Sequence, residues 1–234
     1  RCVEETELNE NLKKKKISAK AVFGGSFAKG TWIAGDYDID VFVKFALKHK
    51  TDELSELLAS VLGSWKVEKI HGSRDYFWVD DSVHFEVVPV LDIKKPEDAC
   101  NVTDFSPLHV SWVKRNGKPF LNDIRLAKLF CKACNCYGAE SYIRGFSGHV
   151  LDVLVIHFKG FIPLLKAASK WKPKVVVDHY RFHKGRALFN LNKSKTQGPL
   201  VVVDPVDPFR NAAAALSKEN FSKFIRTARS FLKR

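Results

Sequence analysis

The chain has 234 residues, of which 45% are hydrophobic and 28% charged, a composition that is typical of a folded globular protein and excludes a disordered or low-complexity chain. The 39 lysines and arginines exceed the 26 aspartates and glutamates and give a net charge of +13, which favours a polyanionic partner such as RNA or DNA. The longest apolar runs, such as Val150 to Phe158, are interrupted by Asp152 and His157 and are too short for a membrane span. We therefore expect no membrane partner.

The start of the chain and its cysteines bear on where the protein works. Residues 1–16 are charged and have no apolar core, so we predict no signal peptide. The chain begins at Arg1 and contains no methionine, so we expect the native start to be missing. The five cysteines are an odd number, which favours reduced thiols and a cytoplasmic location.

Three of the cysteines are close together in the sequence. Cys131, Cys134 and Cys136 have a spacing that a metal site can use, but they lack a second pair of ligands. The first two also fall on one face of a predicted helix. We therefore favour ordinary thiols over a zinc site.

The first half of the chain is predicted to combine strands with short helices. Leucines and valines recur at helical spacing in residues 51–62, and Phe27 to Trp32 is expected to begin a short helix. Residues 94–103 are predicted to form a linker. The predicted strands are residues 20–24, 38–45, 65–70, 76–79 and 83–90.

Two aspartates open the second of these strands. Side chains alternate between the faces of a strand, so Asp38 and Asp40 point the same way, roughly 7 Å apart at Cα, with the apolar residues on the opposite face. Carboxylates at this spacing repel each other unless cations lie between them, and Mg²⁺ with water and phosphate oxygens is the usual solution. An Asp-x-Asp pair on its own is more often a solvated strand edge.

A turn of small residues precedes the aspartate pair. Gly24, Gly25 and Ser26 follow an apolar strand, and eleven residues separate Ser26 from Asp38. The backbone N–H groups of such a turn are suited to hold a phosphate at a helix N-terminus, where Lys29 is expected to add positive charge. The turn therefore favours a phosphate-binding site over a solvated edge.

A third acid lies on the strand predicted at residues 83–90. Glu86 is on the opposite face from Phe85 and Val87, and an acid on an apolar strand is costly unless it is used or paired. If this strand lies beside the aspartate pair, Glu86 supplies a third carboxylate to one site. The alternative is a surface residue on an edge strand. Pro89 fits the end of a strand or an edge.

From Leu108 onward the pattern is mainly helical. Asn122 is expected to cap a helix that ends near Gly138, and Ser147 or Gly148 to start the next one. Residues 161–171 are predicted to be helical, residues 175–178 and 200–203 to be strands, and Asn211 or Ser217 to lead into the last helix. That helix carries an apolar stripe expected to face the core: Phe221, Phe224, Ile225, Ala228, Phe231 and Leu232.

The segment between the two late strands is polar and basic. We predict that it is an exposed arm. Its cations are Arg181, Lys184, Arg186, Lys193 and Lys195.

The Gly25-Ser26 turn followed by Asp38-Ile39-Asp40 resembles the signature of the nucleotidyltransferase superfamily, which includes DNA polymerase beta, poly(A) polymerases and CCA-adding enzymes. The sequence from Gly25 to Asp40 is similar to the archaeal (class I) CCA-adding enzymes in particular. Five further stretches resemble motifs of that family, in the same order: Asp104-Phe-Ser-Pro-Leu-His109, Tyr137-Gly-Ala-Glu140, Arg144-Gly-Phe-Ser-Gly148, Val203-Asp-Pro-Val-Asp207 and Arg210-Asn-Ala-Ala213.

The resemblance implies an α+β fold in two domains. Residues 1–104 would form the nucleotidyltransferase palm, a mixed or antiparallel sheet with helices. Residues 105–234 would form a mainly helical central domain that binds the nucleotide. The family's C-terminal body and tail domains, which grip tRNA, are expected to be absent here, and a homodimer or a second chain is a way to supply them.

The resemblance also implies a function. The family adds or repairs the 3′-terminal CCA of tRNA from CTP and ATP without a nucleic-acid template, so the expected partners are nucleoside triphosphates and the 3′ end and acceptor stem of tRNA. Asp38 and Asp40 would hold two Mg²⁺ ions, and Glu86 would hold the ion that activates the 3′-hydroxyl. In-line positioning and charge neutralisation would carry the transfer.

Further residues acquire roles by position in the family's motifs. The backbone of Gly25 and the side chain of Ser26 would hold triphosphate oxygens, and Arg210 would help to read the Watson–Crick edges of C and A. The remaining nucleotide-binding candidates are Lys29, His109, Arg125, Lys128 and Tyr137.

One position departs from the family, whose third acid is generally aspartate. Glu86 moves its carboxylate by about one C–C bond, roughly 1.5 Å, and a misplacement of about an ångström can cost on the order of a hundredfold in rate. Asp92 is not expected to substitute, because Pro89 intervenes. Two alternatives stay open: a poly(A)- or oligoadenylate-type polymerase of the same superfamily, and a basic RNA-binding remnant whose catalysis is weakened.

Overall fold

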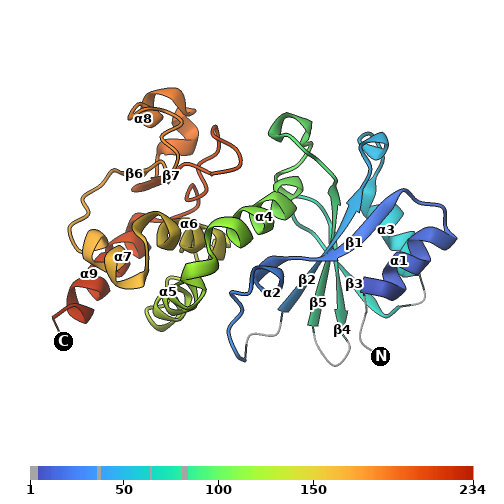
Figure 1. Cartoon of the computed structure of the whole chain (residues 1–234), viewed down its shortest axis with the longest axis horizontal. Helices are drawn as coiled ribbons and strands as arrows, with labels where there is room; N and C mark the ends of the chain where they lie inside the picture. The colour runs from blue at the N-terminus through green and yellow to red at the C-terminus, as the bar shows by residue number, and fades with distance from the viewer. Residues whose placement is uncertain (1–4, 36–37, 64, 81–83, 234) are drawn as a thin grey trace. The chain divides into compact units, whose positions relative to one another are not determined.

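The computed structural model describes residues 5–35, 38–63, 65–80 and 84–233. The chain divides into two compact units, Arg1–Ser111 and Trp112–Arg234 (Figure 1). The domain boundary predicted between residues 104 and 105 stays a prediction. Among the described helices, none is long and apolar enough to cross a membrane.

The first unit is built on a five-stranded mixed sheet with the strand order β1-β2-β5-β4-β3. Only the central pair, β2 and β5, runs parallel, and the other neighbours are antiparallel. The predicted α+β class is confirmed, and the strand predicted at residues 38–45 has these bounds in the structure. The strands are β1 (Ala19–Phe23), β2 (Asp38–Phe45), β3 (Val67–Ile70), β4 (Tyr76–Asp80) and β5 (His84–Leu91).

Helices cover both faces of this sheet. Helices α1 (Glu5–Lys14) and α3 (Leu54–Leu62) lie together on one side (Figure 1), where α1 packs against β1 and α3 against β5, and both bury leucines. Helix α2 (Gly25–Lys29) packs against β2, and its Ala28 contacts the small core of Phe42, Val90 and Val110. The acidic residues of β2 share their face with Phe42, so α2 lies on the side of the sheet that carries them.

Several predicted bounds in the first unit need correction. The short helix begins at Gly25 and stops at Lys29, before Trp32, because Gly30 adopts a left-handed conformation with φ 73° and its N–H closes the turn. The helix predicted from Thr51 begins at Leu54. Pro89 lies inside β5 and does not end it, and the pairing of β4 with β5 stops at Val87, so no ladder bond on that side is lost.

The predicted linker at residues 94–103 is an ordered connection. It contains the 3₁₀ turns η2 (Pro96–Asp98) and η3 (Val102–Phe105). The fully buried carboxylate of Asp104 accepts the N–H groups of Leu91 and Cys100, at 2.9 and 3.0 Å, and pairs with the guanidinium of Arg74. This ion pair fixes the end of β5, because every hydrogen-bonding position of the buried carboxylate must be used.

Helix α4 (Ser106–Asn116) contains the boundary between the units, and the second unit is mainly helical, as predicted. Its two short strands, β6 (Val175–Val177) and β7 (Leu200–Val202), pair in parallel. Its helices are α5 (Leu121–Ala133), α6 (Gly148–Phe158), α7 (Phe161–Ala168), α8 (Ala187–Asn190) and α9 (Lys218–Phe231), and its 3₁₀ turns are η4 (Lys118–Phe120) and η5 (Lys193–Thr196).

The core of the second unit surrounds α6, which is buried from Val150 to Ile156. The predicted stripe of α9 packs there through Phe221, Phe224, Ile225 and Ala228. Hydroxyl caps hold the starts of both helices: the side chain of Ser147 accepts the N–H of Val150, and that of Ser217 accepts the N–H of Asn220. Of the two starts that the sequence offered for each helix, Ser147 and Ser217 are the N-caps, and Gly148 is the first helical residue of α6.

Two predictions in this unit are wrong. Asn122 does not cap α5, whose N-cap is Phe120. The side chain of Asn122 instead accepts a hydrogen bond from Arg125 at 2.6 Å. The basic segment is not a simple exposed arm. Its α8 is anchored by Ala187 and Leu191, which pack in a small core with Val201 and Val203.

Candidate active site

The three acidic candidates lie on one face of the sheet in the first unit. In the parallel pairing of β2 with β5, Asp40 is opposite Glu86 and Asp38 is opposite His84. Neighbouring strands are about 4.8 Å apart, and residues two apart on a strand share a face. The parallel register therefore brings together three carboxylates that are far apart in the sequence.

Glu86 is half-buried and has a specific hydrogen-bond partner. Its cross-strand neighbour on β4 is Trp78, whose indole Nε1 donates to Oε1 of Glu86 at 3.2 Å. Burial, followed by the negative charge of Asp40, raises the pKa of Glu86 above its ordinary value, while the indole donation opposes the rise. Ionised Glu86 therefore adds to a concentration of negative charge that a bound cation relieves.

Trp78 was not singled out by the sequence. Its position in the predicted strand 76–79 was visible, but its contact with Glu86 depends on the register of β4 against β5. The ring of His84 also packs edge-on against Trp78, with 4.9 Å between centroids. The two rings form one wall beside the carboxylate.

The glycine turn lies directly against Asp40. The N–H of Gly24 donates to the carbonyl of Asp40 at 2.7 Å. A Cβ on Gly25, whose φ is +48°, would lie 1.6 Å from Oδ2 of Asp40, and a Cβ on Gly24 would lie 2.5 Å from the ring of Phe42. Only glycine fits at these two positions without a shift of the strand residues. Ser26 follows at the start of α2, and Lys29 is the last residue of this five-residue helix.

The donor set fits a hard divalent cation. All three side chains offer carboxylate oxygens, the ligands that Mg²⁺, Ca²⁺ and Mn²⁺ prefer. The raised pKa of Glu86 agrees with this fit, because repulsion by Asp40 contributes to it. Asp92 lies at the other end of β5, where its carboxylate pairs with Nζ of Lys44 at 2.7 Å.

In the second unit, Lys128 and Tyr137 meet at the N-terminus of α6. Lys128 lies on α5 with only 4% of its surface exposed. A Cβ on Gly148 would lie 3.1 Å from the hydroxyl of Tyr137 and 3.8 Å from Nζ of Lys128. The aromatic ring of Tyr137 also faces Nζ of Lys132, 5.2 Å from its centroid. A buried lysine and a hydroxyl at the start of an eleven-residue helix form a suitable anion-binding arrangement.

The chain path explains how Tyr137 reaches Gly148. Residues 136–146 fold back on themselves, so that Tyr137 bridges to Phe146 and the N–H of Gly145 donates to the carbonyl of Gly138 at 2.6 Å. Helix α9 secures this loop, because the amide of Asn220 donates to the carbonyl of Ile143 at 2.7 Å. The two motif stretches around Tyr137 and Ser147 are thus adjacent in space.

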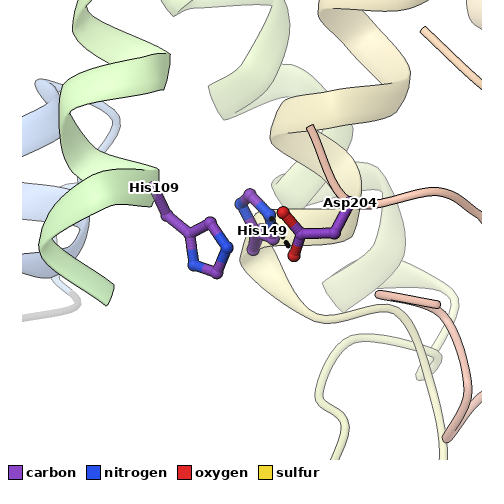
Figure 2. Close-up of side chains that lie close together, drawn as sticks. All are labelled: His109, His149 and Asp204. Carbon is purple, nitrogen blue, oxygen red and sulfur yellow. Dashed lines mark ion pairs between the residues drawn. The ribbon is translucent and has the colours of Figure 1, made fainter. Parts of the chain in front are cut away.

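Arg210 is held by a buried acid. The carboxylate of Asp204, which is fully buried, pairs with the guanidinium of Arg210 and also lies 3.5 Å from Nε2 of His149. Figure 2 shows the imidazole of His149 and the carboxylate of Asp204 facing each other. The N–H of Val206 donates to the same carboxylate at 2.9 Å. Asp204 fixes the direction of Arg210, a role that its place in a predicted turn did not indicate.

Two candidates remain, His109 and Arg125. His109, also drawn in Figure 2, is a nearly buried residue of α4, with its ring tilted against Phe105 at 6.4 Å. Arg125 hydrogen-bonds Asn122 on the outer surface of α5. The structure thus brings together Gly25 and the three acids in the first unit, and Lys128 and Tyr137 in the second, while Arg125 stays apart.

The cysteine group is a packed set of thiols. The Sγ atoms of Cys134 and Cys136 lie 3.2 Å apart. Hydrogen bonding to Cys131 raises the pKa of the Cys136 thiol, and hydrogen bonding to Cys136 raises the pKa of the Cys134 thiol. Metal binding requires thiolates, which this environment disfavours.

Two family models match the chain. The model described as nucleotidyltransferase domain matches residues 5–100, and the model described as tRNA nucleotidyltransferase, second domain, matches residues 122–234. The two matches fall within the two units of the structure.

Curated relatives give a similar result. The chain is 46% identical to the CCA-adding enzyme of Nanoarchaeum equitans over 215 residues, which are 89% of this chain and 54% of that protein. It is 33% identical to the CCA-adding enzyme of Archaeoglobus fulgidus over 239 residues, which are 97% of this chain and 51% of that protein. The chain therefore spans about half the length of the curated relatives it matches.

Solved structures share the fold at low sequence identity. The Cid1 poly(U) polymerase with Mg²⁺ and 3′-dATP bound matches with a TM-score of 0.72 and 12% identity, covering 97% of this chain and 84% of that one. The Escherichia coli CdnC protein with ATP matches with a TM-score of 0.65 and 19% identity, covering 96% of this chain and 80% of that one. These likenesses extend over both units of the chain.

Proposed function

Because this chain belongs to the tRNA nucleotidyltransferase family, to which the archaeal CCA-adding enzymes belong, we propose that it carries the catalytic half of a CCA-adding enzyme. The reaction would transfer cytidylate and adenylate from CTP and ATP to the 3′-hydroxyl of a tRNA. The observation that carries the proposal is the pairing of Asp40 with Glu86 across β2 and β5, with Gly25 closed against Asp40.

The carboxylates of the first unit would hold the metal ions. Asp38 and Asp40 would hold two Mg²⁺ ions, and Glu86 would hold the one that activates the 3′-hydroxyl. When bound, Mg²⁺ lowers the pKa of the attacking hydroxyl and neutralises charge on the triphosphate. The indole of Trp78, on the β4 side of Glu86, would fix one carboxylate oxygen of Glu86 through its hydrogen bond and so limit the rotamers of this longer side chain.

The other candidates would bind the nucleotide. The Gly25 backbone and Ser26 would hold triphosphate oxygens next to Asp40, and Lys29 would add long-range attraction from the end of α2. Lys128 and Tyr137, at the start of α6, would hold phosphate or sugar oxygens. Arg210, oriented by Asp204, would donate to the edge of the base. His109, by its place in the family motif, would contact the triphosphate or sugar, and Arg125 would add positive charge from the surface of α5.

The units divide these tasks. The palm would comprise residues 1–104 and hold the metal ions, and residues 105–234 would recognise the sugar and the base. The tRNA would be the polyanion for which the charge of +13 is suited. A homodimer or a second chain would add further grip on the tRNA.

The test is extension of a tRNA that lacks its 3′-terminal CCA. We expect wild-type protein with Mg²⁺ to add two C residues from CTP and then one A from ATP, and we expect Asp40→Asn to add none. Long products made from ATP alone would instead indicate a poly(A)-type polymerase. Absence of any incorporation, with CTP still bound, would refute the proposed activity for this chain.

A further inference from the structure

The connection between β6 and β7 and the loop after β7 carry exposed aromatic residues that are not among the candidate site residues. Phe189 on α8 is 81% exposed, and Phe209, in the loop after β7, is 64% exposed. Tyr180 and Phe182 are also exposed and pack against each other, with ring centroids 5.4 Å apart. Large exposed apolar side chains that gather in one region mark an interaction surface. We call these four rings the aromatic platform.

The platform stands on a fixed scaffold. The carboxylate of Asp178 accepts the N–H groups of Phe182 and His183 at 3.0 and 2.8 Å. Nε2 of the buried His183 donates to the carbonyl of Pro208 at 2.6 Å, and its Nδ1 accepts from the amide of Asn190 at 3.2 Å. A carbonyl can only accept, which fixes this tautomer. The backbone segments that carry the rings are therefore held in place before any partner binds.

His183 also links the parts of the platform. Its ring packs edge-on against Phe209, with 5.8 Å between centroids. It follows Phe182 in sequence and hydrogen-bonds Asn190, the residue after Phe189. The exposed rings thus surround one buried side chain. Figure 1 shows that α8, which carries Phe189, lies next to β6 and β7.

The charge of this segment is strongly positive. Residues 178–199 contain five lysines and arginines and a single acid, Asp178, whose carboxylate is already engaged by backbone N–H groups. All five cations are exposed. The guanidinium of Arg186 lies over the ring of Phe189, 5.4 Å from its centroid. Cations interleaved with exposed rings match a polyanion that also offers flat apolar faces.

We propose that the aromatic platform, together with Arg186, binds unpaired nucleotides of RNA by stacking their bases on the exposed rings. A duplex hides its base faces, so the platform would select single strands. The inference rests on the proposed function only for the identity of that RNA, which would be the unpaired part of the tRNA substrate.

The decisive variant is Phe189→Ala in the full chain. The side chain is 81% exposed, so its truncation removes almost no packing. The control is Phe231→Ala on α9, a phenylalanine that is 45% exposed and packs edge-on against Phe130 and Phe161, so a melting curve must also show that the variant is folded. Fluorescence anisotropy would measure the binding of a short labelled oligoribonucleotide, both single-stranded and annealed to its complement.

We expect Phe189→Ala to weaken single-strand binding by about 5- to 100-fold, the range for loss of one stacked base, and to leave duplex binding unchanged. Phe231→Ala should change neither affinity. Arg186→Gln should lower the salt dependence of single-strand binding, because one phosphate contact is lost. Equal losses for single strand and duplex, or no loss, would overturn the inference.

Separate measurements keep this inference distinct from the proposed function. Stabilisation of the chain against melting by CTP and Mg²⁺, and incorporation of CTP, report the catalytic residues and should be unaltered by Phe189→Ala at saturating RNA. If the chain incorporates no nucleotide but its RNA binding depends on Phe189, the proposed enzyme activity is wrong and the RNA-binding inference stands. Conversely, if Phe189→Ala abolishes self-association in sedimentation velocity but not RNA binding, the platform is an interface between copies and the RNA inference is wrong.

Discussion

The contact between Gly25 and Asp40 leads to a quantitative prediction. In Gly25→Ala the new methyl carbon would lie 1.6 Å from Oδ2 and 2.4 Å from Cγ of Asp40. Ordinary contacts are about 3.5 Å or longer, so the carboxylate must move by roughly 2 Å or the turn must open. The positive φ of Gly25 adds strain of about 1–2 kcal/mol for a residue with a Cβ.

The displacement of Asp40 determines the size of the effect on activity. A misplacement of about 1 Å at a reacting centre costs on the order of a hundredfold in rate. We therefore expect Gly25→Ala to lose at least about a hundredfold in kcat/KM for CTP addition and to bind Mn²⁺ more weakly, while unfolding a few degrees earlier.

A second glycine separates the clash from the backbone strain. Gly185 has a φ of +83°, and a Cβ there would meet nothing within 4 Å. Gly185→Ala should thus show similar strain in a melting curve but wild-type Mn²⁺ binding, measured by electron paramagnetic resonance. If Gly25→Ala binds Mn²⁺ and adds CTP like Gly185→Ala, the turn does not position Asp40 and the reasoning is refuted.

Three further variants test other contacts. Trp78→Phe keeps a ring but removes the indole donor to Glu86, so Mn²⁺ affinity in a titration should fall by about tenfold or more; an unchanged affinity would contradict a positioning role. Without metal, Glu86→Gln should raise Tm at neutral pH, because burial and Asp40 raise the pKa of Glu86 and its ionised form destabilises the fold. That gain in Tm should vanish below pH 4.5, the ordinary glutamate pKa, because Glu86 of the wild type is then protonated in both the folded and the unfolded state. Melting scans across pH test this cause, and a gain in Tm that persists in acid would contradict it. Asp204→Asn removes the buried charge that pairs with Arg210 and should cost about 3–5 kcal/mol of unfolding free energy by denaturant titration, whereas Asp207→Asn, whose amide oxygen can still accept the N–H of Phe209, should cost less than about 1 kcal/mol.

The sequence predicted the strands that carry the acids because their pattern is local. Alternating apolar residues after Asp38 define β2, and the opposite faces of Glu86 and Phe85 follow from a period of two. The parallel register that places Glu86 opposite Asp40 is a long-range property. From the sequence we could say only that Glu86 joins the two aspartates if the two strands lie side by side.

Other features depended on contacts that no local pattern encodes. The donation from Trp78 to Glu86 needs the register of β4, and the anchoring of Arg210 needs a turn that buries Asp204. Asn122 shows the reverse failure. We predicted Asn122, a good capping residue, as the N-cap, but the N-cap is Phe120, two residues earlier, and the side chain of Asn122 accepts a hydrogen bond from Arg125.

The basic segment after β6 was judged by its polarity alone. Its charges are exposed as predicted, but Ala187 and Leu191 are too few and too widely spaced to reveal a small core by periodicity. The aromatic platform became visible only when that core fixed the positions of the exposed rings.

We propose that the carboxylates of β2 and β5 form one metal site for nucleotidyl transfer. Anomalous diffraction from crystals soaked with Mn²⁺ and CTP would locate the metal ions. We expect manganese peaks within coordination distance of Asp38 and Asp40, with Glu86 contacting one of the ions and the triphosphate lying beside Gly25. Manganese bound away from β2 and β5, or a triphosphate that does not approach Asp40, would contradict it.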